Sequence, residues 1–180
     1  FNYAEVSLPG GCAWGPRPVN YHLQAIEALG AEVNLSDGMI IAKGELKGGL
    51  INFQQSSVGA TGNALMAAVN ANGATTIKNA AKEPEIEALC HFLLKMGADI
   101  KGIGTDEIII IGQKTLNADI EYSVIPDRIE AGTFLIAGAC TYGDISVTNI
   151  NPNHLEIVLN YLAEAGFNLD VQNDSIRIYP

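Results

Sequence analysis

Three similar segments of the sequence decide its fold, and they read HLQAIEALGAEV at 22–33, EALCHFLLKMGADI at 87–100 and HLEIVLNYLAEAGFNL at 154–169. Each has the apolar spacing of an amphipathic helix, then a glycine, then a short run typical of a strand. The glycines are Gly30, Gly97 and Gly166, which recur at nearly equal intervals. Because glycine readily takes the left-handed conformation that ends many helices, each one predicts a helix end followed by a strand.

A second set of segments repeats with nearly the same period. ALMAAV at 64–69 and FLIAGA at 134–139 read as almost wholly apolar helices, so we expect both helices to be buried on all sides. Each leads through a glycine to a β-branched run that ends in asparagine, at Asn79 and at Asn149. Turn residues at 37–38, 104–106 and 173–174 separate other β-branched runs, a pattern typical of hairpins.

These repeats predict a mixed α/β (α+β) fold of β-α-β-α-β-β-type units. Within one period of about 68 residues the expected order is helix, strand, strand, strand, helix, strand. Apolar helices between strand pairs predict sheets packed around buried helices. The segment 119–126 joins two repeats, and the last repeat ends directly after its hairpin.

The composition excludes several classes of protein. The 180 residues include 20 Asp and Glu against 10 Lys and Arg, a formal net charge of −10, and 48% are apolar. Such a chain can bury a core, so it is not disordered. No apolar run reaches the ~20 residues that span a bilayer, and the acidic balance argues against a nucleic-acid partner.

The three cysteines do not form a metal-binding or disulfide pattern. Cys12, Cys90 and Cys140 lie far apart, with no CxxC pair. Cys90 and Cys140 lie within apolar helical patterns, so we expect both to be small buried hydrophobic residues in a reducing compartment.

The densest candidate for chemistry is the segment 8–20, LPGGCAWGPRPVN. It holds three of the 19 glycines and three of the seven prolines, as expected of a loop with unusual backbone geometry. Arg17 follows Cys12 closely in this loop, and a nearby cation lowers the pKa of a thiol. The segment is therefore either a reactive thiol with an anion-binding arginine or a surface loop with an incidental cysteine, and composition leaves both open.

Other candidate segments begin helices. QSSVGATGN at 55–63 offers backbone N–H groups and a helix dipole, the outline of a phosphate site, although a simple N-cap with small residues explains it as well. KEPE at 82–85 and IPDRIEAGT at 125–133 place carboxylates at helix starts, where they complement the dipole.

Taken together, these segments resemble the enolpyruvyl transferases, in particular those that act on UDP-N-acetylglucosamine. The similarity runs through the whole chain in order, and it is carried by SLPGGC at 7–12, RPV at 17–19, LGA at 29–31, SVGAT at 57–61, NAAKEPEI at 79–86, MGA at 96–98 and PDRIEAGTF at 126–134. The related shikimate-pathway transferases share the architecture but not the Cys12 loop.

The resemblance implies a reaction. The family members that act on UDP-N-acetylglucosamine move the enolpyruvyl group of phosphoenolpyruvate to the 3′-hydroxyl of the sugar and release phosphate, the first committed step of peptidoglycan synthesis. The reaction runs by addition and elimination through a tetrahedral intermediate. The resemblance makes Cys12 the acid that protonates phosphoenolpyruvate and the thiol that fosfomycin alkylates. Arg17 would bind phosphate.

The resemblance also implies a set of site residues. Those that would bind substrate are Arg17, Pro18, Val19, Asn20, Tyr21, Gln55, Ser56, Ser57, Val58 and Gly59. Those that would line the cleft are Glu83, Glu85, Asp127 and Arg128. Asn20 stands where several relatives have Asp, so it keeps a hydrogen-bond acceptor for the uracil but loses the charge. Gln55 stands where some relatives have Lys, so binding of the diphosphate would depend more on backbone N–H groups and the helix dipole.

The resemblance implies an inside-out α/β barrel, or prism, that is incomplete here. Residues 1–125 would be the C-terminal two-thirds of a first domain that bears the catalytic loop, and 126–180 the first, incomplete repeat of a second. We expect an internal piece that is inactive alone, because a Lys-Asn pair, a second Arg and the Asp thought to deprotonate the sugar hydroxyl have no counterpart in it.

The resemblance further implies a monomeric enzyme of the bacterial cytoplasm, with a role in cell wall biogenesis, cell shape and cell division. It implies no cofactor and no metal, and neither nucleic acid nor membrane as a partner. Two alternatives stay open: a non-catalytic module that binds a nucleotide sugar, and a shikimate-pathway transferase. Cys12 together with Arg17 favours a transferase that acts on UDP-N-acetylglucosamine over the shikimate enzyme.

Overall fold

The computed structural model describes residues 2–11, 13, 15, 17–113 and 115–180. The described chain divides into two compact units, one that extends to Tyr122 and one that begins at Ser123. That these units belong to a first and a second domain with the limits 1–125 and 126–180 stays a prediction.

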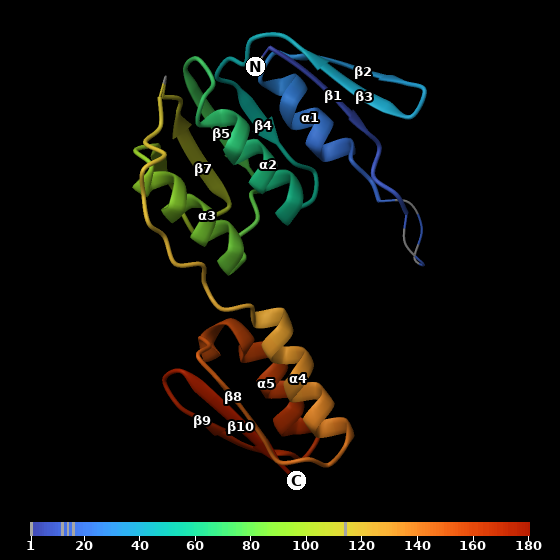
Figure 1. Ribbon diagram of the computed structural model, residues 1–180, viewed down its shortest axis with the longest axis vertical. Coiled ribbons are helices and arrows are strands. Elements are labelled where there is room, and N and C mark those ends of the chain that lie inside the picture. The colour runs from blue at the N-terminus through green and yellow to red at the C-terminus, as the bar shows by residue number, and fades with distance from the viewer. Residues whose placement is uncertain (1, 12, 14, 16, 114) are drawn as a thin grey trace. The chain divides into compact units, whose positions relative to one another are not determined.

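The first unit contains helices α1 (Asn20–Ala28), α2 (Val58–Ala68) and α3 (Pro84–Lys95), which lie side by side in Figure 1. Strands β1 (Tyr3–Ser7), β2 (Glu32–Ser36) and β3 (Met39–Lys43) form an antiparallel sheet of order β1-β3-β2. Strands β4 (Leu50–Asn52), β5 (Ala74–Lys78), β6 (Asp99–Lys101) and β7 (Glu107–Ile111) form a sheet of order β4-β5-β7-β6.

Two parallel strands of the first unit, β4 and β5, end at the same edge of their sheet. β4 pairs with β5 in parallel, with Leu50 opposite Thr76 and Asn52 opposite Lys78, and α2 connects the two strands. Because α2 follows β4 and α3 follows β5, the carboxyl ends of both strands lead into helix N-termini at the same edge of the sheet. In open α/β sheets this is the edge where ligands bind.

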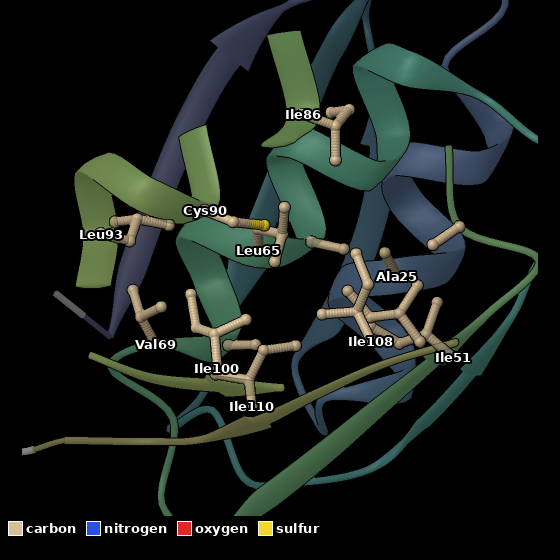
Figure 2. Packing of buried hydrophobic residues seen from close by; sticks show 14 of the residues in the cluster. Ala25, Ile51, Leu65, Val69, Ile86, Cys90, Leu93, Ile100, Ile108 and Ile110 are labelled. Carbon is tan, nitrogen blue, oxygen red and sulfur yellow. The ribbon is translucent and has the colours of Figure 1, made fainter. Parts of the chain in front are cut away.

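Helix α2 forms the centre of the first core. Ala60, Ala64, Leu65 and Ala68 are all inaccessible to solvent, and the small alanine side chains let α1 and α3 approach closely on either side. Figure 2 shows Leu65 beside Cys90 of α3, with isoleucines of the four-stranded sheet beneath them. Burial of this apolar surface is the main favourable term that holds the unit together.

The second unit repeats part of the first. It contains α4 (Arg128–Cys140), strand β8 (Ile145–Thr148), a 3₁₀ turn η1 (Pro152–Leu155), α5 (Glu156–Glu164), β9 (Asn168–Val171) and β10 (Ser175–Tyr179). Its antiparallel sheet has the order β8-β10-β9, which matches β5-β7-β6 and β1-β3-β2 element by element. The mixed α/β fold and the repeated unit are confirmed, and the open sheets are consistent with an incomplete barrel.

The backbone confirms the glycine pattern in the sequence. Gly30, Gly97 and Gly166 have φ values of 95°, 96° and 94°, and each ends a helix just before a strand. The predicted hairpins β2–β3, β6–β7 and β9–β10 also form. Asn79 and Asn149, which hold equivalent places in the two units, both take left-handed conformations with φ of 55° and 58°. A polar side chain that bonds locally makes this conformation accessible to asparagine.

The expectation that the apolar helices are buried on all sides is wrong for α4. Ile129, Phe134 and Ile136 are 61%, 56% and 47% exposed, and on α2 Met66 is 53% exposed. The sheet and α5 cover one side of α4, whereas no other described element of the second unit covers the opposite side. A helix that is apolar all round needs neighbours on every side, and one sheet with one helix supplies only half of them.

Two further expectations are wrong: that Cys140 is buried, and that a strand precedes the second apolar helix of the repeat. Cys140 is exposed, because it lies on the uncovered side of α4, whereas Cys90 is buried as predicted.

The strand expected before the second apolar helix does not form in the described residues of 112–127. Instead, part of this segment packs on α3. Tyr122 donates its hydroxyl hydrogen to the carbonyl of Ala88 (3.0 Å), and its ring meets Phe92 edge-on.

The buried Cys90 thiol makes the stability of the fold depend on pH. Burial, with the Glu87 charge as a smaller cause, raises the pKa of Cys90 from 9.0 to about 11. Between these values the unfolded chain loses this proton while the folded chain keeps it. The free energy of unfolding therefore falls as the pH rises from 9 to about 11, by about 1.4 kcal/mol per pH unit.

We expect urea unfolding to show this fall in the native chain and a smaller fall in Cys90→Ala, which lacks the thiol. Cys90→Ala should be less stable at neutral pH, because it leaves a small cavity beside Leu65. Equal slopes in the two proteins above pH 9 would contradict the assignment of the fall to this thiol.

No helix in the described parts of the chain combines the length and apolar character needed to cross a membrane.

Candidate functional site

The candidate site of the first unit lies at the carboxyl edge of β4 and β5. Three segments meet there: residues 17–21 at the start of α1, residues 53–59 between β4 and α2, and residues 79–85 between β5 and α3. Of the predicted site residues that the structure describes, all except Asp127 and Arg128 lie in these segments. Their closeness follows from specific contacts between the elements that carry them.

The N-terminus of α2 is capped by Ser57. The Ser57 backbone is extended (φ −140°, ψ 117°), and its hydroxyl accepts a hydrogen bond from the Ala60 amide at 3.4 Å. The first backbone bond of the helix runs from the Thr61 amide to the Ser57 carbonyl, so the amides of Val58 and Gly59 precede it. Such amides, together with the positive end of the helix dipole, attract an anion.

Contacts with β4 and α2 fix the start of α1 beside this helix end. The Tyr21 ring meets Phe53 edge-on with ring centres 5.8 Å apart, and the Gln24 amide donates to the Asn52 carbonyl at 3.1 Å. The His22 ring lies against Gly59, where an added Cβ would approach it to 3.3 Å. Tyr21 is therefore partly buried against the core, whereas its neighbours Arg17, Pro18 and Asn20 are exposed.

Three hydrogen bonds fasten the segment 79–83. The Asn79 side-chain amide donates to the Phe53 carbonyl at 3.1 Å, and the Ala80 amide donates to the Asp106 carbonyl at 2.9 Å. The Ala81 amide donates to the Thr61 hydroxyl at 3.1 Å. Two of these bonds join the segment to β4 and α2, so the loops that follow β4 and β5 are tied to one another.

The start of α3 brings charges of both signs to the site. Glu83 is the N-cap residue and half-buried, Pro84 is the first helical residue, and Glu85 and Glu87 lie in the first turn. Carboxylates here are stabilised by the helix dipole, which is the simplest explanation for them. Exposed Lys82 precedes them, and with Arg17 it gives the site two cations in a chain of net charge −10. A local field of this kind can attract an anion in spite of the net charge.

Sequence reasoning missed the contacts of two neighbours of the predicted residues. Thr61 lies in the candidate segment 55–63, but the pattern assigns it no role, and the spacing of His22 within its helical pattern does not point to the site. Only packing reveals them, because His22 touches Gly59 and Thr61 binds the Ala81 amide.

The remaining candidates lie elsewhere or outside the described residues. Cys12 is outside them, so its role stays a prediction. Asp127 and Arg128 belong to the second unit, where the Asp127 carboxylate caps α4 by accepting from the amides of Ile129 (2.8 Å) and Glu130 (3.1 Å). Asp127 holds the place in the second unit that Ser57 holds in the first, so both units cap the equivalent helix with a short polar side chain.

A hollow of about 440 Å³ lies between α1 and the β1-β3-β2 sheet. Its lining is mainly apolar, from side chains such as Val6, Leu23, Ile26 and Ile40, so it does not suit a phosphate. The described residues also contain no group of three or more His, Cys, Asp or Glu side chains placed to hold a metal ion. What the candidate site offers is backbone N–H groups and side-chain cations, the groups that bind phosphates.

Comparison with known families agrees with this chemistry. The family model described as EPSP synthase (3-phosphoshikimate 1-carboxyvinyltransferase) matches residues 2–180. The chain belongs to the EPSP synthase family. In solved structures, this family's fold recurs in the enolpyruvyl transferase NikO from Streptomyces tendae, with a TM-score of 0.78 over 99% of this chain and 44% of that one, at 20% identity. EPSP synthase from Acinetobacter baumannii matches with a TM-score of 0.66 over 97% of this chain and 43% of that one, also at 20% identity.

Curated relatives that are much more similar in sequence carry another name. UDP-N-acetylglucosamine 1-carboxyvinyltransferase from Chlorobium luteolum is 55% identical over 98% of this chain, and that from Campylobacter hominis is 51% identical over the whole chain. The chain spans 42% and 43% of these two relatives' lengths.

Proposed function

We propose that the whole protein to which this chain belongs transfers the enolpyruvyl group of phosphoenolpyruvate to the 3′-hydroxyl of UDP-N-acetylglucosamine, with release of phosphate. The observation that carries the proposal is the 51–55% identity to relatives named for this reaction. The solved EPSP synthases share the fold at 20% identity. The larger identity favours UDP-N-acetylglucosamine over a shikimate acceptor.

The geometry of the first unit supports this substrate. A nucleotide sugar presents a diphosphate, which suits the Val58 and Gly59 amides at the N-terminus of α2 together with the Ser57 cap. Arg17, Pro18, Val19 and Asn20 lie at the start of the neighbouring helix, where they would hold the uridine. Neither Gln55 nor Ser56 carries a charge, so backbone groups and the helix dipole would contribute most of the attraction at this position.

Within this proposal the side chains have separate tasks. Arg17 would form charge-assisted bonds to phosphate. Cys12 would protonate phosphoenolpyruvate while the sugar hydroxyl adds, and the tetrahedral adduct would then eliminate phosphate. Glu83 and Glu85 would line the substrate cleft, and the same role stays a prediction for Asp127 and Arg128. No step of this chemistry needs a cofactor or a metal.

The proposal extends to the setting of the enzyme. We propose a monomeric enzyme of the bacterial cytoplasm that acts in peptidoglycan synthesis, and through it in cell shape and division. The free thiols of Cys90 and Cys140 support a reducing compartment. The net charge of −10 argues against a nucleic-acid partner.

The proposal is tested by measuring phosphate release from phosphoenolpyruvate with two acceptors. We expect the full-length protein to release phosphate with UDP-N-acetylglucosamine and not with shikimate 3-phosphate. The reverse preference would show the shikimate alternative to be correct. Binding of UDP-N-acetylglucosamine without phosphate release would show the non-catalytic alternative to be correct.

A further inference from the structure

Thr61 forms a buried hydrogen bond that joins helix α2 to the segment 79–83 of the candidate site. It lies in the first turns of α2, one turn after the Ser57 cap, and is wholly inaccessible to solvent. Its hydroxyl accepts from the Ala81 amide, and Ala81 is itself buried. Glu83, the cap of α3, follows Ala81 closely. The bond thus ties the chain that leads into α3 to the first turns of α2.

The second unit shows that the fold does not require this bond. There the residue equivalent to Thr61 is Ala131, which is also buried and has no hydroxyl. The residue equivalent to Ala81 is Asn151, whose side chain accepts from the Asn153 amide at 3.1 Å. The polar cap and the left-handed asparagine are present in both units, at Ser57 and Asp127 and at Asn79 and Asn149. The bond between Thr61 and the Ala81 amide has no counterpart at Ala131, which lacks a side-chain acceptor.

A threonine at this place has a cost that the fold alone does not explain. Alanine favours the helix more than threonine does, and a buried hydroxyl is unfavourable unless it is bonded. Within a helix, a threonine hydroxyl commonly bonds back to its own preceding turn, whereas here it receives a bond from a different segment of the chain. The bond therefore indicates that the segment 79–83 has to be held in a defined position.

We propose that Thr61 is a positioning residue for UDP-N-acetylglucosamine. It holds the segment 79–83, and with it Lys82 and Glu83, in register with the amides of Val58 and Gly59 at the N-terminus of α2. This inference rests on the proposed function for the identity of the ligand. The positioning itself is a property of the protein and can be tested without substrate.

The chain contains a matched control in Thr75 of β5. Thr75 is as completely buried as Thr61, but within the described part of the chain its hydroxyl has no hydrogen-bond partner. Both residues can be changed to valine, which keeps the shape and removes only the hydroxyl. Thr61→Val leaves the Ala81 amide without its acceptor, whereas Thr75→Val breaks no bond.

In the full-length protein, we expect Thr61→Val to raise the KM for UDP-N-acetylglucosamine roughly tenfold, the effect of losing about one hydrogen bond to the ligand when the segment 79–83 shifts. The KM for phosphoenolpyruvate should stay within about twofold, since a local shift of this segment removes no bond from Arg17. Thr61→Ser, which keeps the hydroxyl, should restore the native KM. Thr75→Val should leave both KM values unchanged.

Hydrogen exchange of the Ala81 amide gives an independent measurement. We expect it to accelerate at least roughly tenfold in Thr61→Val and to stay at the native rate in Thr75→Val. If Thr61→Val does not fold, Thr61→Ala makes the same test, because alanine occupies the equivalent place in α4. An unchanged Ala81 exchange rate would overturn the positioning role. So would a native KM for UDP-N-acetylglucosamine, or equal changes in Thr61→Val and Thr75→Val. An inactive native protein would instead count against the proposed function, and the exchange measurement would still decide the positioning.

Discussion

Replacing Cys12 by alanine in the full-length protein is expected to reduce kcat for enolpyruvyl transfer by about 10²- to 10⁴-fold. Loss of a positioned general acid has an effect of this size. The thiol would supply the proton that phosphoenolpyruvate gains when the sugar hydroxyl adds to it. Cys12→Asp should retain part of the activity, because a carboxylic acid can also donate a proton. The measurement is the rate of phosphate release with saturating UDP-N-acetylglucosamine.

The other two cysteines provide controls within the same chain. Cys140 is exposed in the 180-residue chain, so a general alkylating reagent such as iodoacetamide should label it in that chain. Cys90 should resist this reagent, because it is buried and its pKa is raised to about 11. Fosfomycin, which resembles a substrate, should label Cys12 alone. Cys12→Asp should lose fosfomycin labelling, and Cys140→Ala should keep both labelling and activity.

The assignment of Cys12 fails on either of two results. One is a Cys12→Ala protein that turns over at the native rate. The other is a fosfomycin adduct mapped by mass spectrometry to Cys90 or Cys140 while Cys12 stays free.

Removal of the guanidinium in Arg17→Ala is expected to lower kcat/KM roughly 10- to 100-fold in the full-length protein. Bonds between charged groups and phosphate are each worth about 1.5–3 kcal/mol, which corresponds to this range. Arg17→Lys should recover only part of the loss, because an ammonium group cannot form the paired bonds of a guanidinium. The loss should shrink as salt is added, since Arg17 is exposed and its charge is screened.

Lys101→Ala is a suitable control for Arg17→Ala. Lys101 is an exposed cation at the end of β6, outside the segments that form the candidate site. Its removal changes the net charge by the same amount but should leave kcat/KM unchanged. A similar loss in both variants would mean that Arg17 acts through the net charge of the protein and binds no phosphate directly.

The sequence was sufficient to predict the local elements of the fold. Gly30, Gly97 and Gly166 predicted three helix ends because few other residues take a φ near 95° without strain. The turn at Asp37-Gly38 predicted a hairpin for the same reason, since both residues have positive φ. These predictions succeed because the backbone conformation depends on the residue itself.

Burial was harder to predict, because it depends on what surrounds an element. Cys140 and Ile136 belong to a pattern as apolar as that of α2, yet both are exposed because nothing described in their unit covers that side of α4. Apolar surface of this extent on a helix usually lies against another part of a protein. The segment before α4 likewise lacks the strand that its repeat predicted, and Tyr122 within it binds α3 instead.

The candidate site was predictable only in part. The segments 55–59 and 83–85 could be selected from the sequence, because glycine, serine and charged residues at helix starts have a recognisable pattern. The segment 17–21 was selected by its resemblance to the enolpyruvyl transferases. How these segments meet depends on tertiary contacts, such as Tyr21 on Phe53 and Thr61 on Ala81, and no local pattern encodes these.

The most direct test of the central claim is a single carbon-13 NMR measurement of the product. The full-length protein is incubated with carbon-13-labelled phosphoenolpyruvate and UDP-N-acetylglucosamine, and the position of the label is followed. The proposed function predicts a vinyl ether on the 3′-carbon of the sugar, formed in equal amount with free phosphate. Unchanged phosphoenolpyruvate, its hydrolysis to pyruvate, or a label attached at any other position of the sugar would contradict it.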